Sequence, residues 1–245
     1  MKFDVVTLFP ELITQGANHS IIKRAIDNNK ISINTHNPRN YSLDKHKKVD
    51  DSPYGGGAGM VLSCQPYLDC IKAIDQELSS KKIILTPQGK NYSQDMAEEF
   101  SKIDQLIIIC GHYEGYDERI RELSEATEVS IGDFVLTGGE YPALCIIDST
   151  MRLIPGVLGD ETSATTDSHS DGLLEYSQYT KPREYNGLKV PEVLLSGNHS
   201  KIEHWRRKQQ LIRTKEKRPD LYNKFLKEKH SKFDAKIIEE INKEL

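Results

Sequence analysis

The chain has 245 residues, of which 37% are hydrophobic and 29% charged, and this fits one large domain or a large and a small one. No apolar run approaches the roughly 20 residues of a membrane span, and Asp4 interrupts the stretch where a secretory signal would be apolar. The four cysteines show no CxxC spacing and are expected to be reduced and buried. These features exclude a membrane protein or a disulfide-rich secreted protein, and they favour a soluble cytoplasmic one.

The net charge of -4 is unevenly distributed along the chain. Residues 197–245 contain 14 Lys and Arg against 8 Asp and Glu, whereas residues 1–196 contain 19 against 29. A basic segment attached to an acidic body indicates a polyanionic partner for that segment alone. A solvated helical surface is the alternative, and the charge count does not separate the two.

In the first part of the chain, two predicted strands enclose a helix. Residues 2–9 (KFDVVTLF) predict the first strand, and residues 31–36 (ISINTH) alternate as a second strand does. Apolar residues around 21–26 have helical spacing. Residues 44–62 form a polar, glycine-rich loop, after which a helix is predicted from Pro66.

Strands and helices then alternate along the chain. Residues 82–86, 105–110 and 128–135 predict strands, and residues 94–101 and 144–154 have helical patterns. Continuously apolar strands suit a parallel sheet that is covered on both faces. The pattern therefore predicts an α/β fold with a mostly parallel sheet and helices on both sides.

Two domains are predicted, with a linker between them. Residues 161–171 (ETSATTDSHSD) lack periodicity and are dense in Ser, Thr and Asp, which predicts a flexible interdomain linker. The linker separates a domain of residues 1–160 from a small helical domain of residues 172–245.

The small domain is expected to consist of helices. Ser200 and Glu203 fit a capping box at the start of one helix. The predicted apolar stripe of this helix consists of Ile202, Trp205 and Ile212. Three basic residues fall largely outside that stripe: Arg206, Arg207 and Lys208. A last helix is marked by Phe233, Ile237 and Ile241.

The segment at 53–60 (PYGGGAGM) resembles a phosphate-binding loop in composition only. No Lys-Ser/Thr follows it, as a P-loop requires, and the sixth position counted from Gly55 is Met60 instead of glycine. The segment also follows a polar stretch and not a strand. Its glycines still indicate a backbone that lies close to a ligand or forms a flexible lid.

Three further glycine-containing segments follow predicted strands: TPQG at 86–89, GHYEG at 111–115 and IGDFVLTGG at 131–139. Because ligands of open α/β sheets bind beyond the carboxyl ends of the strands, these segments are expected to line one pocket of amides and carbonyls. Apolar walls such as Ile131 and Leu136 suit a flat heterocycle such as adenine. The lack of clustered Lys or Arg disfavours a di- or triphosphate. Tight turns between strands and helices would also explain the glycines.

These segments belong to a set of motifs that spans nearly the whole chain. The set is LFPE (8–11), VDDSPYGGGAGM (49–60), LTPQG (85–89), CGHYEGYDERI (110–120), SIGDFVLTGGE (130–140), IPGVLG (154–159), SATTDS (163–168) and VLLSGNH (193–199). With these motifs in this order, the chain closely resembles the bacterial tRNA (guanine-N1)-methyltransferases, which are S-adenosylmethionine-dependent enzymes of the knotted SPOUT class. Each motif alone is weak, but the set is highly specific.

The resemblance implies a deep trefoil knot in which the segment at 130–139 threads the other two and holds the cofactor bent. Knots are otherwise nearly absent from proteins, and hydrophobic periodicity does not predict one. The glycines in the segment would lack side chains because backbone crosses backbone and ligand closely. The residues implied to bind the cofactor are Leu85, Thr86, Pro87, Gly111, Tyr113, Ser130, Ile131, Gly132, Asp133, Phe134, Val135, Leu136, Gly138, Gly139 and Pro142.

The reaction that the resemblance implies is methylation of N1 of guanine-37, the base 3′ of the anticodon, in support of reading-frame maintenance. N1 carries a proton that must leave before or as the nitrogen attacks the methyl group, and the family motif assigns the general base to Asp167. Arg152 is implied to stabilise negative charge on O6, and Glu114, Gly57 and Gly59 to contact the substrate. From local sequence alone, Asp167 suits a turn or cap and Arg152 a helix-end ion pair.

The resemblance also implies two macromolecular partners. Basic side chains of the helical domain would contact tRNA phosphates, and the candidates are Arg206, Arg207, Lys208, Arg213, Lys215, Lys217 and Arg218. A second copy of the chain would form a homodimer in which Asp167 of one subunit completes the pocket of the other. The family implies a need for Mg²⁺, but no compact ligand cluster stands out and no metal residue is assigned.

Two positions depart from the family pattern. His112 stands where relatives often have Arg, which would weaken a contact to RNA or to a carboxylate. Ala58 replaces a common Pro, which gives a looser loop. Neither departure removes a proposed catalytic group.

Three other functions stay open on these patterns. One is a SPOUT enzyme that acts on another RNA position or on a ribose 2′-hydroxyl, and such an enzyme would not need Asp167. A second is a non-catalytic module that binds the cofactor and RNA. A generic nucleotide-binding α/β protein is the third, disfavoured by the missing phosphate motifs.

Overall fold

The computed structural model describes residues 1–75, 80–159, 167–228 and 230–243 of the chain. The chain divides into two compact units, Met1–Glu161 and Thr162–Leu245, which we call the N-terminal and C-terminal units. Most of the linker predicted at 161–171 lies outside the described residues, which resume at Asp167. Across the described parts of the chain, no helix is both long and apolar enough to cross a membrane.

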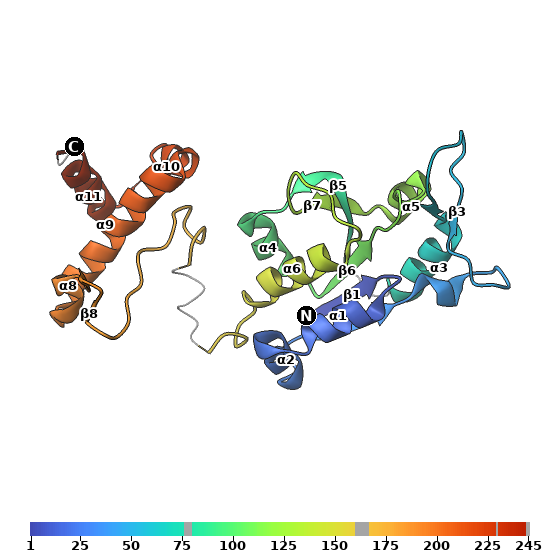
Figure 1. The fold of residues 1–245 in the computed structure, drawn as a ribbon, viewed down its shortest axis with the longest axis horizontal. Helices are drawn as coiled ribbons and strands as arrows, with labels where there is room; N and C mark the ends of the chain where they lie inside the picture. Colours follow the sequence, from blue (N-terminus) through green and yellow to red (C-terminus); the bar gives the residue numbers. More distant parts are fainter. Residues whose placement is uncertain (76–79, 160–166, 229, 244–245) are drawn as a thin grey trace. The chain divides into compact units, whose positions relative to one another are not determined.

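The N-terminal unit contains a five-stranded sheet in the order β2-β1-β6-β5-β7, in which all neighbouring strands are parallel. The strands are β1 (Lys2–Val6), β2 (Ser32–His36), β5 (Ser80–Asn91), β6 (Gln105–Cys110) and β7 (Thr127–Ser130). The predicted α/β class and the parallel sheet are therefore confirmed (Figure 1).

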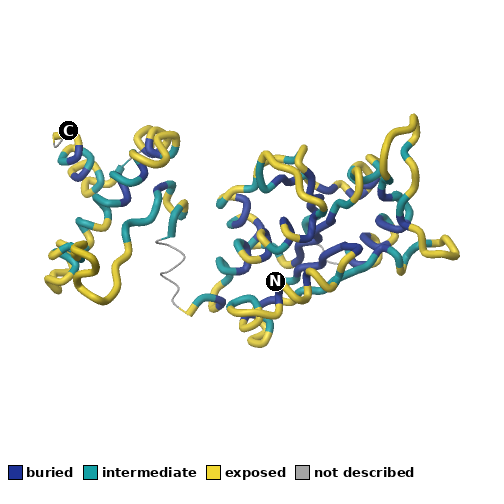
Figure 2. Tube along the Cα trace, viewed as in Figure 1, coloured by how far each residue is buried: buried dark blue, intermediate teal, exposed yellow. Residues whose placement is uncertain are grey.

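Helices cover both faces of this sheet. One core packs sheet residues such as Val5 and Ile108 against helices α1 (Pro10–Ala17), α2 (Ser20–Asp27), α4 (Gln94–Phe100) and α6 (Glu140–Met151). The other core packs Val6 and Ile109 against α3 (Cys64–Ile74) and α5 (Glu118–Ser124), with the 3₁₀ turn η1 (Pro38–Tyr41) at its side. Neighbouring strand residues thus point to opposite faces, and both faces are buried (Figure 2).

Three predicted strands differ from those observed. The first ends at Val6 and not at residue 9: the Thr7 amide still donates to the His36 carbonyl at 3.0 Å, and the Thr7 hydroxyl donates to Glu140 at 2.7 Å and accepts from the Phe9 amide at 2.9 Å. The strand predicted at 82–86 extends to Asn91 after a register shift against β7. The strand predicted at 128–135 ends at Ser130, where the chain bends.

A small antiparallel pair closes the glycine-rich loop of the N-terminal unit. Strand β3 (Asp50–Asp51) precedes the loop and β4 (Val61–Leu62) follows it, with Asp50 opposite Leu62. The pair is fixed to the rest of the unit, since the amide of Leu62 bonds the Gly115 carbonyl at 3.0 Å.

The cysteines are all free, but they are not all buried as predicted. Cys70 and Cys110 lie in the cores, and burial raises the pKa of Cys70 to about 12. Cys64 is half-buried and Cys145 is exposed on α6, so the prediction of burial was wrong for Cys145 and only partly met by Cys64.

The C-terminal unit consists mainly of helices: α8 (Glu192–Leu195), α9 (His199–Lys217), α10 (Pro219–Phe225) and α11 (Lys232–Lys243). A two-stranded hairpin, β8 (Glu184–Tyr185) and β9 (Leu188–Lys189), precedes them. The unit has its own small core, made of Leu173, Leu211, Tyr222, Phe225, Ile237 and Ile241.

Helix α9 differs from its prediction in two respects. It begins at His199, and the cap is Asn198, whose side chain accepts from the Lys201 amide at 3.1 Å, so the capping box at Ser200 was wrong. Its buried residues are Gln210, Leu211 and Thr214, whereas the predicted apolar stripe is half-buried, with Ile212 packed against the core of the unit. Arg207 is four residues before Leu211 and therefore lies on the buried side.

Candidate functional site

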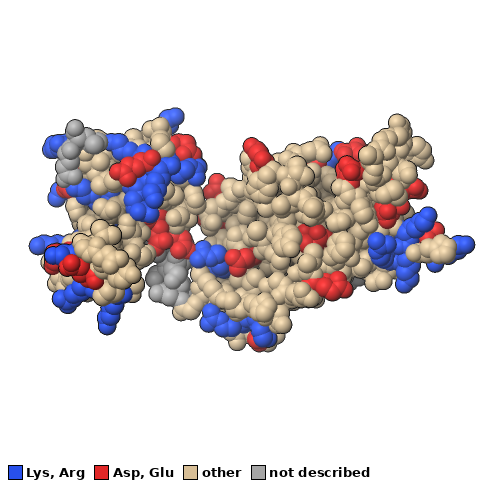
Figure 3. Space-filling view, viewed as in Figure 1, with Lys and Arg blue, Asp and Glu red and all other residues tan. Residues whose placement is uncertain are grey.

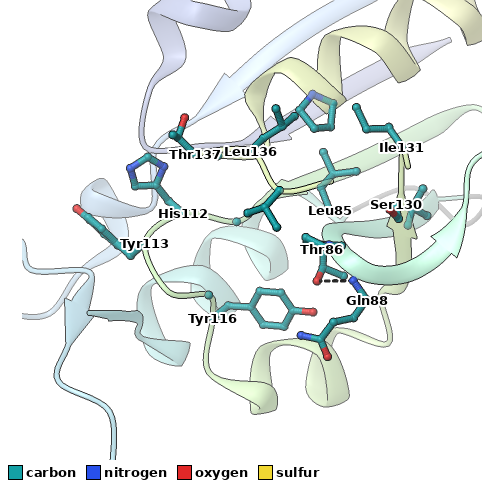
Figure 4. Close-up of a pocket in the computed structure, with 18 of the residues that line it drawn as sticks. Leu85, Thr86, Gln88, His112, Tyr113, Tyr116, Ser130, Ile131, Leu136 and Thr137 are labelled. Carbon is teal, nitrogen blue, oxygen red and sulfur yellow. Dashed lines mark hydrogen bonds between the residues drawn. The ribbon is translucent and has the colours of Figure 1, made fainter. Parts of the chain in front are cut away.

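A cavity of about 350 Å³ lies at the carboxyl ends of β6 and β7 and at the bulge within their neighbour β5 (Figure 4). It is lined by residues 85–88, 111–116, 129–132 and 134–139, together with Glu118 and Pro142. The three segments that follow the predicted strands thus line one cavity, as expected from the sequence.

Main chain approaches main chain closely at the wall of this cavity. The Gly139 amide donates to the Gly111 carbonyl at 2.9 Å, and a β-bridge joins Gly138 to His112. A Cβ at Gly139 would lie 2.8 Å from the Cα of Cys110 and 3.0 Å from the nitrogen of Gly111. Only glycine fits at position 139, because the neighbouring atoms are backbone and cannot rotate away.

The bend after β7 is stabilised by two hydrogen bonds between Ser130 and Gly132. The Ser130 hydroxyl donates to the Gly132 carbonyl at 3.0 Å and accepts from the Gly132 amide at 3.2 Å. Gly132 has a φ of 150°, a value that favours glycine, and the Phe134 amide then bonds its carbonyl at 2.9 Å. This bend stops the strand and turns residues 131–136 into the cavity wall.

The opposite wall is formed by a bulge in β5. The amide of Gln88 donates to the Thr86 hydroxyl at 3.3 Å, as drawn in Figure 4. Nearby, the Tyr116 hydroxyl donates to Glu128 at 3.0 Å. Burial raises the pKa of Tyr116 and the carboxylate raises it further, so the phenol stays protonated and fixes the ring at the cavity.

The cavity has apolar walls and negative rather than positive side chains. Among the described residues that line it there is no Lys or Arg, whereas Glu114 and Glu118 both contribute. Tyr113 adopts a φ of 58°, which is rare for an aromatic residue. The centre of its ring lies 4.7 Å from the centre of the His112 ring. This lining suits a neutral or cationic ligand better than a polyphosphate.

Of the residues predicted to bind a cofactor, all except Asp133 line the cavity. Four further lining residues, Gln88, His112, Gly115 and Thr137, lie within the segments that were expected to form the pocket. Tyr116, Glu118 and Val129 were missed, because they lie just outside those segments.

The residues predicted to bind the substrate base are brought together in part. Glu114 lines the cavity, and its amide bonds the Met60 carbonyl at 3.1 Å. A Cβ at Gly59 would lie 2.6 Å from the Glu114 carboxylate. Gly57 is exposed and has only Pro53 near it. The glycine-rich loop therefore reaches the cavity through Gly59 and Met60.

The two predicted catalytic residues lie outside the cavity wall. Arg152 is half-buried at the C-cap of α6, at the other end of this helix from Pro142. Asp167 is half-buried in the C-terminal unit, where its carbonyl accepts from the Ser170 amide at 3.2 Å. Their catalytic roles stay predictions.

No metal centre emerges from the parts of the chain that the structure describes, because no three His, Cys, Asp or Glu side chains there are grouped to hold an ion. The described residues therefore offer no ligand set for magnesium.

The basic side chains of α9 are not equivalent. Arg206 is exposed, with its guanidinium 4.8 Å from the centre of the Tyr176 ring. Arg207 is largely buried, with 17% of its side chain exposed, and it bonds Asp171 and Asp234. Arg213 donates to the Glu175 carbonyl at 3.1 Å.

Comparison with known proteins gives a family for this architecture. Residues 1–224 match the family model described as tRNA (Guanine-1)-methyltransferase TrmD. The chain belongs to this family. The match ends within α10, so α11 lies beyond it.

Similar tRNA (guanine-1)-methyltransferases cover the chain almost completely. The protein named tRNA (guanine-N(1)-)-methyltransferase from Staphylococcus carnosus is 53% identical over 245 residues, which is 100% of this chain and 99% of that protein. Its counterpart from Ruminiclostridium cellulolyticum is 59% identical over 226 residues, 91% of this chain and 97% of that protein. The Staphylococcus aureus (strain JH9) protein of the same name is 56% identical over 225 residues, 92% of each chain.

Proposed function

We propose that this chain transfers the methyl group of S-adenosylmethionine to N1 of guanine-37 in tRNA, and so supports maintenance of the reading frame. Family membership supplies the enzyme class and the tRNA substrate, and enzymes of this family use S-adenosylmethionine. The observation that carries the proposal is the cavity at the ends of β5, β6 and β7, because it is built from the motifs that identify the family.

The cavity suits a ligand that is flat at one end and positively charged at the other. Leu85, Ile131 and Leu136 supply apolar walls, and the main chain of the glycine segments offers donors and acceptors to an adenine. Glu114 and Glu118 add negative charge near the cavity, which favours a sulfonium over a phosphate chain. When bound, S-adenosylmethionine supplies the methyl group.

We also propose that these segments form the trefoil knot. Two close backbone approaches support this topology: Gly139 against Cys110 and Gly111, and Gly89 against Glu128 and Val129. At both glycines a Cβ would meet backbone atoms closer than real contacts allow. A crystallographic chain trace in which the segment at 130–139 passes outside the loop at 86–89 would contradict the knot.

The chemistry requires one base and one cation. We assign proton removal from N1 to Asp167, whose carboxylate takes the proton as the N1–methyl bond forms and the sulfur–methyl bond breaks. Loss of the proton places negative charge on O6, which the guanidinium of Arg152 would stabilise. Glu114, beside Gly59, would contact the target base.

The C-terminal unit would hold the tRNA backbone. Arg206 and Lys208 lie on α9 with other basic side chains, and phosphate contacts of this kind make affinity fall with salt. Arg207 already bonds two carboxylates, those of Asp171 and Asp234.

We propose a homodimer in the cytoplasm, in which Asp167 of one subunit serves the pocket of its partner. Large apolar side chains at the cavity rim support a covered surface, since Phe134, Val135 and Leu136 are 53%, 82% and 41% exposed. Mixing Asp167→Ala and Arg152→Ala chains should restore activity if the site is shared. Mixtures as inactive as either parent would refute sharing.

The test of the proposal is nucleoside mapping by mass spectrometry of tRNA incubated with the protein and S-adenosylmethionine. We expect 1-methylguanosine at position 37. A methylated ribose would indicate the alternative SPOUT activity, and binding without turnover would indicate the non-catalytic module.

Asp167→Ala should reduce turnover about 100-fold or more, while affinity for S-adenosylmethionine stays nearly unchanged, as expected for loss of a general base. Asp95→Ala, at an exposed position of α4, is the matched control and should leave turnover unchanged. If cofactor affinity fell as far as the rate, Asp167 would not be the base.

A further inference from the structure

The N-terminal unit carries a concentrated positive patch, although its sequence is acidic. Figure 3 shows Lys and Arg side chains gathered at the end of this unit near β3. The patch comes from the segment 42–48 (SLDKHKK), which we call the basic loop, and its Lys45, Lys47 and Lys48 are all exposed. No ion pair involving these three lysines occurs among the described residues, so their charges face solvent.

The basic loop is held in one conformation by its own hydrogen bonds. The Asp44 carboxylate accepts from the His46 amide at 2.7 Å and from the Lys48 amide at 3.4 Å. The Ser42 hydroxyl donates to the Lys48 carbonyl at 2.5 Å, and Lys47 has a φ of 54°. The one acid of the loop thus bonds the loop's amides, and the lysines are presented on a fixed turn.

The loop is also attached to helix α3. The Leu43 amide donates to the Gln65 side chain on α3 at 3.3 Å. The chain then runs directly into β3 and the glycine-rich loop, where Tyr54 is 102% exposed. Fixed lysines next to an exposed aromatic ring are a typical combination for nucleic-acid binding.

We propose that the basic loop binds the phosphate backbone of tRNA, as a second contact region besides α9. The inference rests on the proposed function, since it takes tRNA as the substrate. A fixed loop loses little conformational freedom on binding, and each lysine that neutralises a phosphate releases counterions. The basic loop would therefore make tRNA affinity depend on salt even where α9 is unchanged.

The test compares two double variants with equal change in charge. Lys45→Gln with Lys48→Gln removes two charges of the loop and spares Lys47, whose left-handed backbone a substitution would disturb. The control is Lys72→Gln with Lys102→Gln, two exposed lysines elsewhere on the same unit.

We expect the loop variant to bind tRNA about three- to tenfold more weakly near 0.1 M salt and to lower the slope of log affinity against log salt by about one to two. The control should match the wild type, and both should keep affinity for S-adenosylmethionine. A loop variant with the wild-type slope would overturn the inference. Failure of the wild type to methylate guanine N1 would instead overturn the proposed function.

A second inference comes from the turn that carries Asp167. Within residues 167–173, the Ser170 hydroxyl donates to the Asp167 carbonyl at 2.7 Å, and the His169 amide bonds the Leu173 carbonyl at 2.7 Å. Leu173 is fully buried in the core of the C-terminal unit, and the Leu174 amide donates to Thr214 of α9 at 2.8 Å. The turn is therefore closed on itself and attached to α9.

Arg207 binds this turn to two other parts of the unit. Its guanidinium bonds Asp171 in the turn, Asp234 on α11 at 2.6 Å and Gln210 at 3.0 Å. It also lies 5.5 Å from the centre of the Phe225 ring. A planar guanidinium that satisfies several acceptors at once gives a defined orientation, which a lysine in its place would not.

From these contacts we infer that Arg207 is a positioning residue for Asp167, and not a phosphate ligand. This inference depends on the proposed role of Asp167 as the base. The ion pair between Arg207 and Asp171 holds the turn in one conformation, and this conformation fixes the position of Asp167. Small displacements of a catalytic group are costly, so loosening the turn should slow the chemical step.

The test separates a positioning role, which should affect kcat, from a phosphate-binding role, which should affect KM for tRNA. Asp171→Asn removes the negative charge that holds Arg207 to the turn but leaves Arg207 in place, and we expect kcat to fall about tenfold while KM for tRNA changes less than about twofold. Arg207→Lys keeps the charge and should lose kcat similarly. The neighbouring control Arg206→Gln should raise KM for tRNA and spare kcat.

The outcomes are distinguishable from failure of the proposed function. If Asp167→Ala abolishes turnover but Asp171→Asn retains the wild-type kcat, the positioning role is refuted. If Arg207→Lys is fully active and Arg207→Gln only weakens tRNA binding, Arg207 is a phosphate ligand. If Asp167→Ala is itself active, the base has been misassigned and the proposed chemistry fails first.

Discussion

The two units of this chain make their functional surfaces by different means. In the N-terminal unit the cavity wall is main chain packed against main chain, as where Gly139 meets Gly111. In the C-terminal unit α9 is held by charged side chains on a core of six buried residues. At Gly139 the backbone packing leaves no space for a side chain. In the C-terminal unit, the position of α9 depends on ion pairs such as those of Arg207.

The largest expected effect comes from adding one methyl group to the crossing backbone. In Gly89→Ala, the new Cβ would lie 2.6 Å from backbone carbons of Glu128 and Val129, and neither can move without breaking β7. We expect a loss of about 3 kcal/mol or more in the free energy of unfolding, measured by calorimetry. Gly159→Ala, where nothing lies within 4 Å, should change it by less than about 0.5 kcal/mol.

The next effect tests whether charge also matters inside the N-terminal unit. Asp4 is fully buried in β1 and accepts from Gln105 at 2.6 Å, with His36 at 2.8 Å. Asp4→Ala would remove a buried hydrogen-bond partner of Gln105 and of His36, and it should cost about 3 kcal/mol in urea unfolding followed by circular dichroism. Asp4→Asn keeps an acceptor, and a cost equal to that of alanine would show that hydrogen bonding is not the cause.

A smaller effect concerns acid stability of the C-terminal unit. Burial acts to raise the pKa of Asp234, but hydrogen bonds from Arg207 and Ser231 outweigh it, so this pKa lies below its usual value. The stabilisation is therefore present above the unfolded pKa and is lost as the pH falls through the folded one, below about pH 4. Trp205, the only tryptophan, reports unfolding of this unit by fluorescence.

In Asp234→Asn, unfolding at pH 7 should require about 1–2 kcal/mol less, since Arg207 and Asp234 keep 17% and 14% of their side chains exposed. The variant's stability should also change less with pH below about 4 than that of the wild type. An identical acid dependence would remove Asp234 as the titrating group.

The smallest expected effect is the loss of an exposed ion pair in the N-terminal unit. Lys23 and Asp27 form an exposed i,i+4 pair on α2, with half of each side chain in solvent. Lys23→Ala should change the unfolding free energy by less than about 0.5 kcal/mol, because exposed ion pairs gain little. A larger change would mean that burial does not explain why Arg207 and Asp234 matter.

Much of the fold followed from local pattern. The apolar runs at 105–110 and 82–86 predicted parallel strands covered on both faces, and β6 and β5 are such strands. The glycine segments after these strands were expected to share a pocket, and they line one cavity. Local pattern succeeded here because alternation and strand-end loops depend on neighbours in sequence.

Hydrophobic periodicity failed at two places, once because of a local turn and once because of contacts between distant residues. Ser130 ends β7 through its bonds to Gly132, although the following residues are apolar enough to extend a strand. In α9 the apolar stripe accounted for Ile212, which packs against the core, but it missed the buried residues Gln210 and Thr214. These polar residues are buried because Thr214 accepts from the Leu174 amide and Gln210 from Arg207.

The amino-acid sequence by itself determined that strands and helices alternate along the N-terminal unit and that both faces of the sheet are buried. It also contained the motifs that identify the family. These properties arise from side-chain polarity at regular spacing. Only the tertiary structure showed which glycines pack against the backbone of another segment and which arginine is paired with two carboxylates. Both depend on atoms contributed by segments far apart in the chain, and such contacts leave no periodic trace in the sequence.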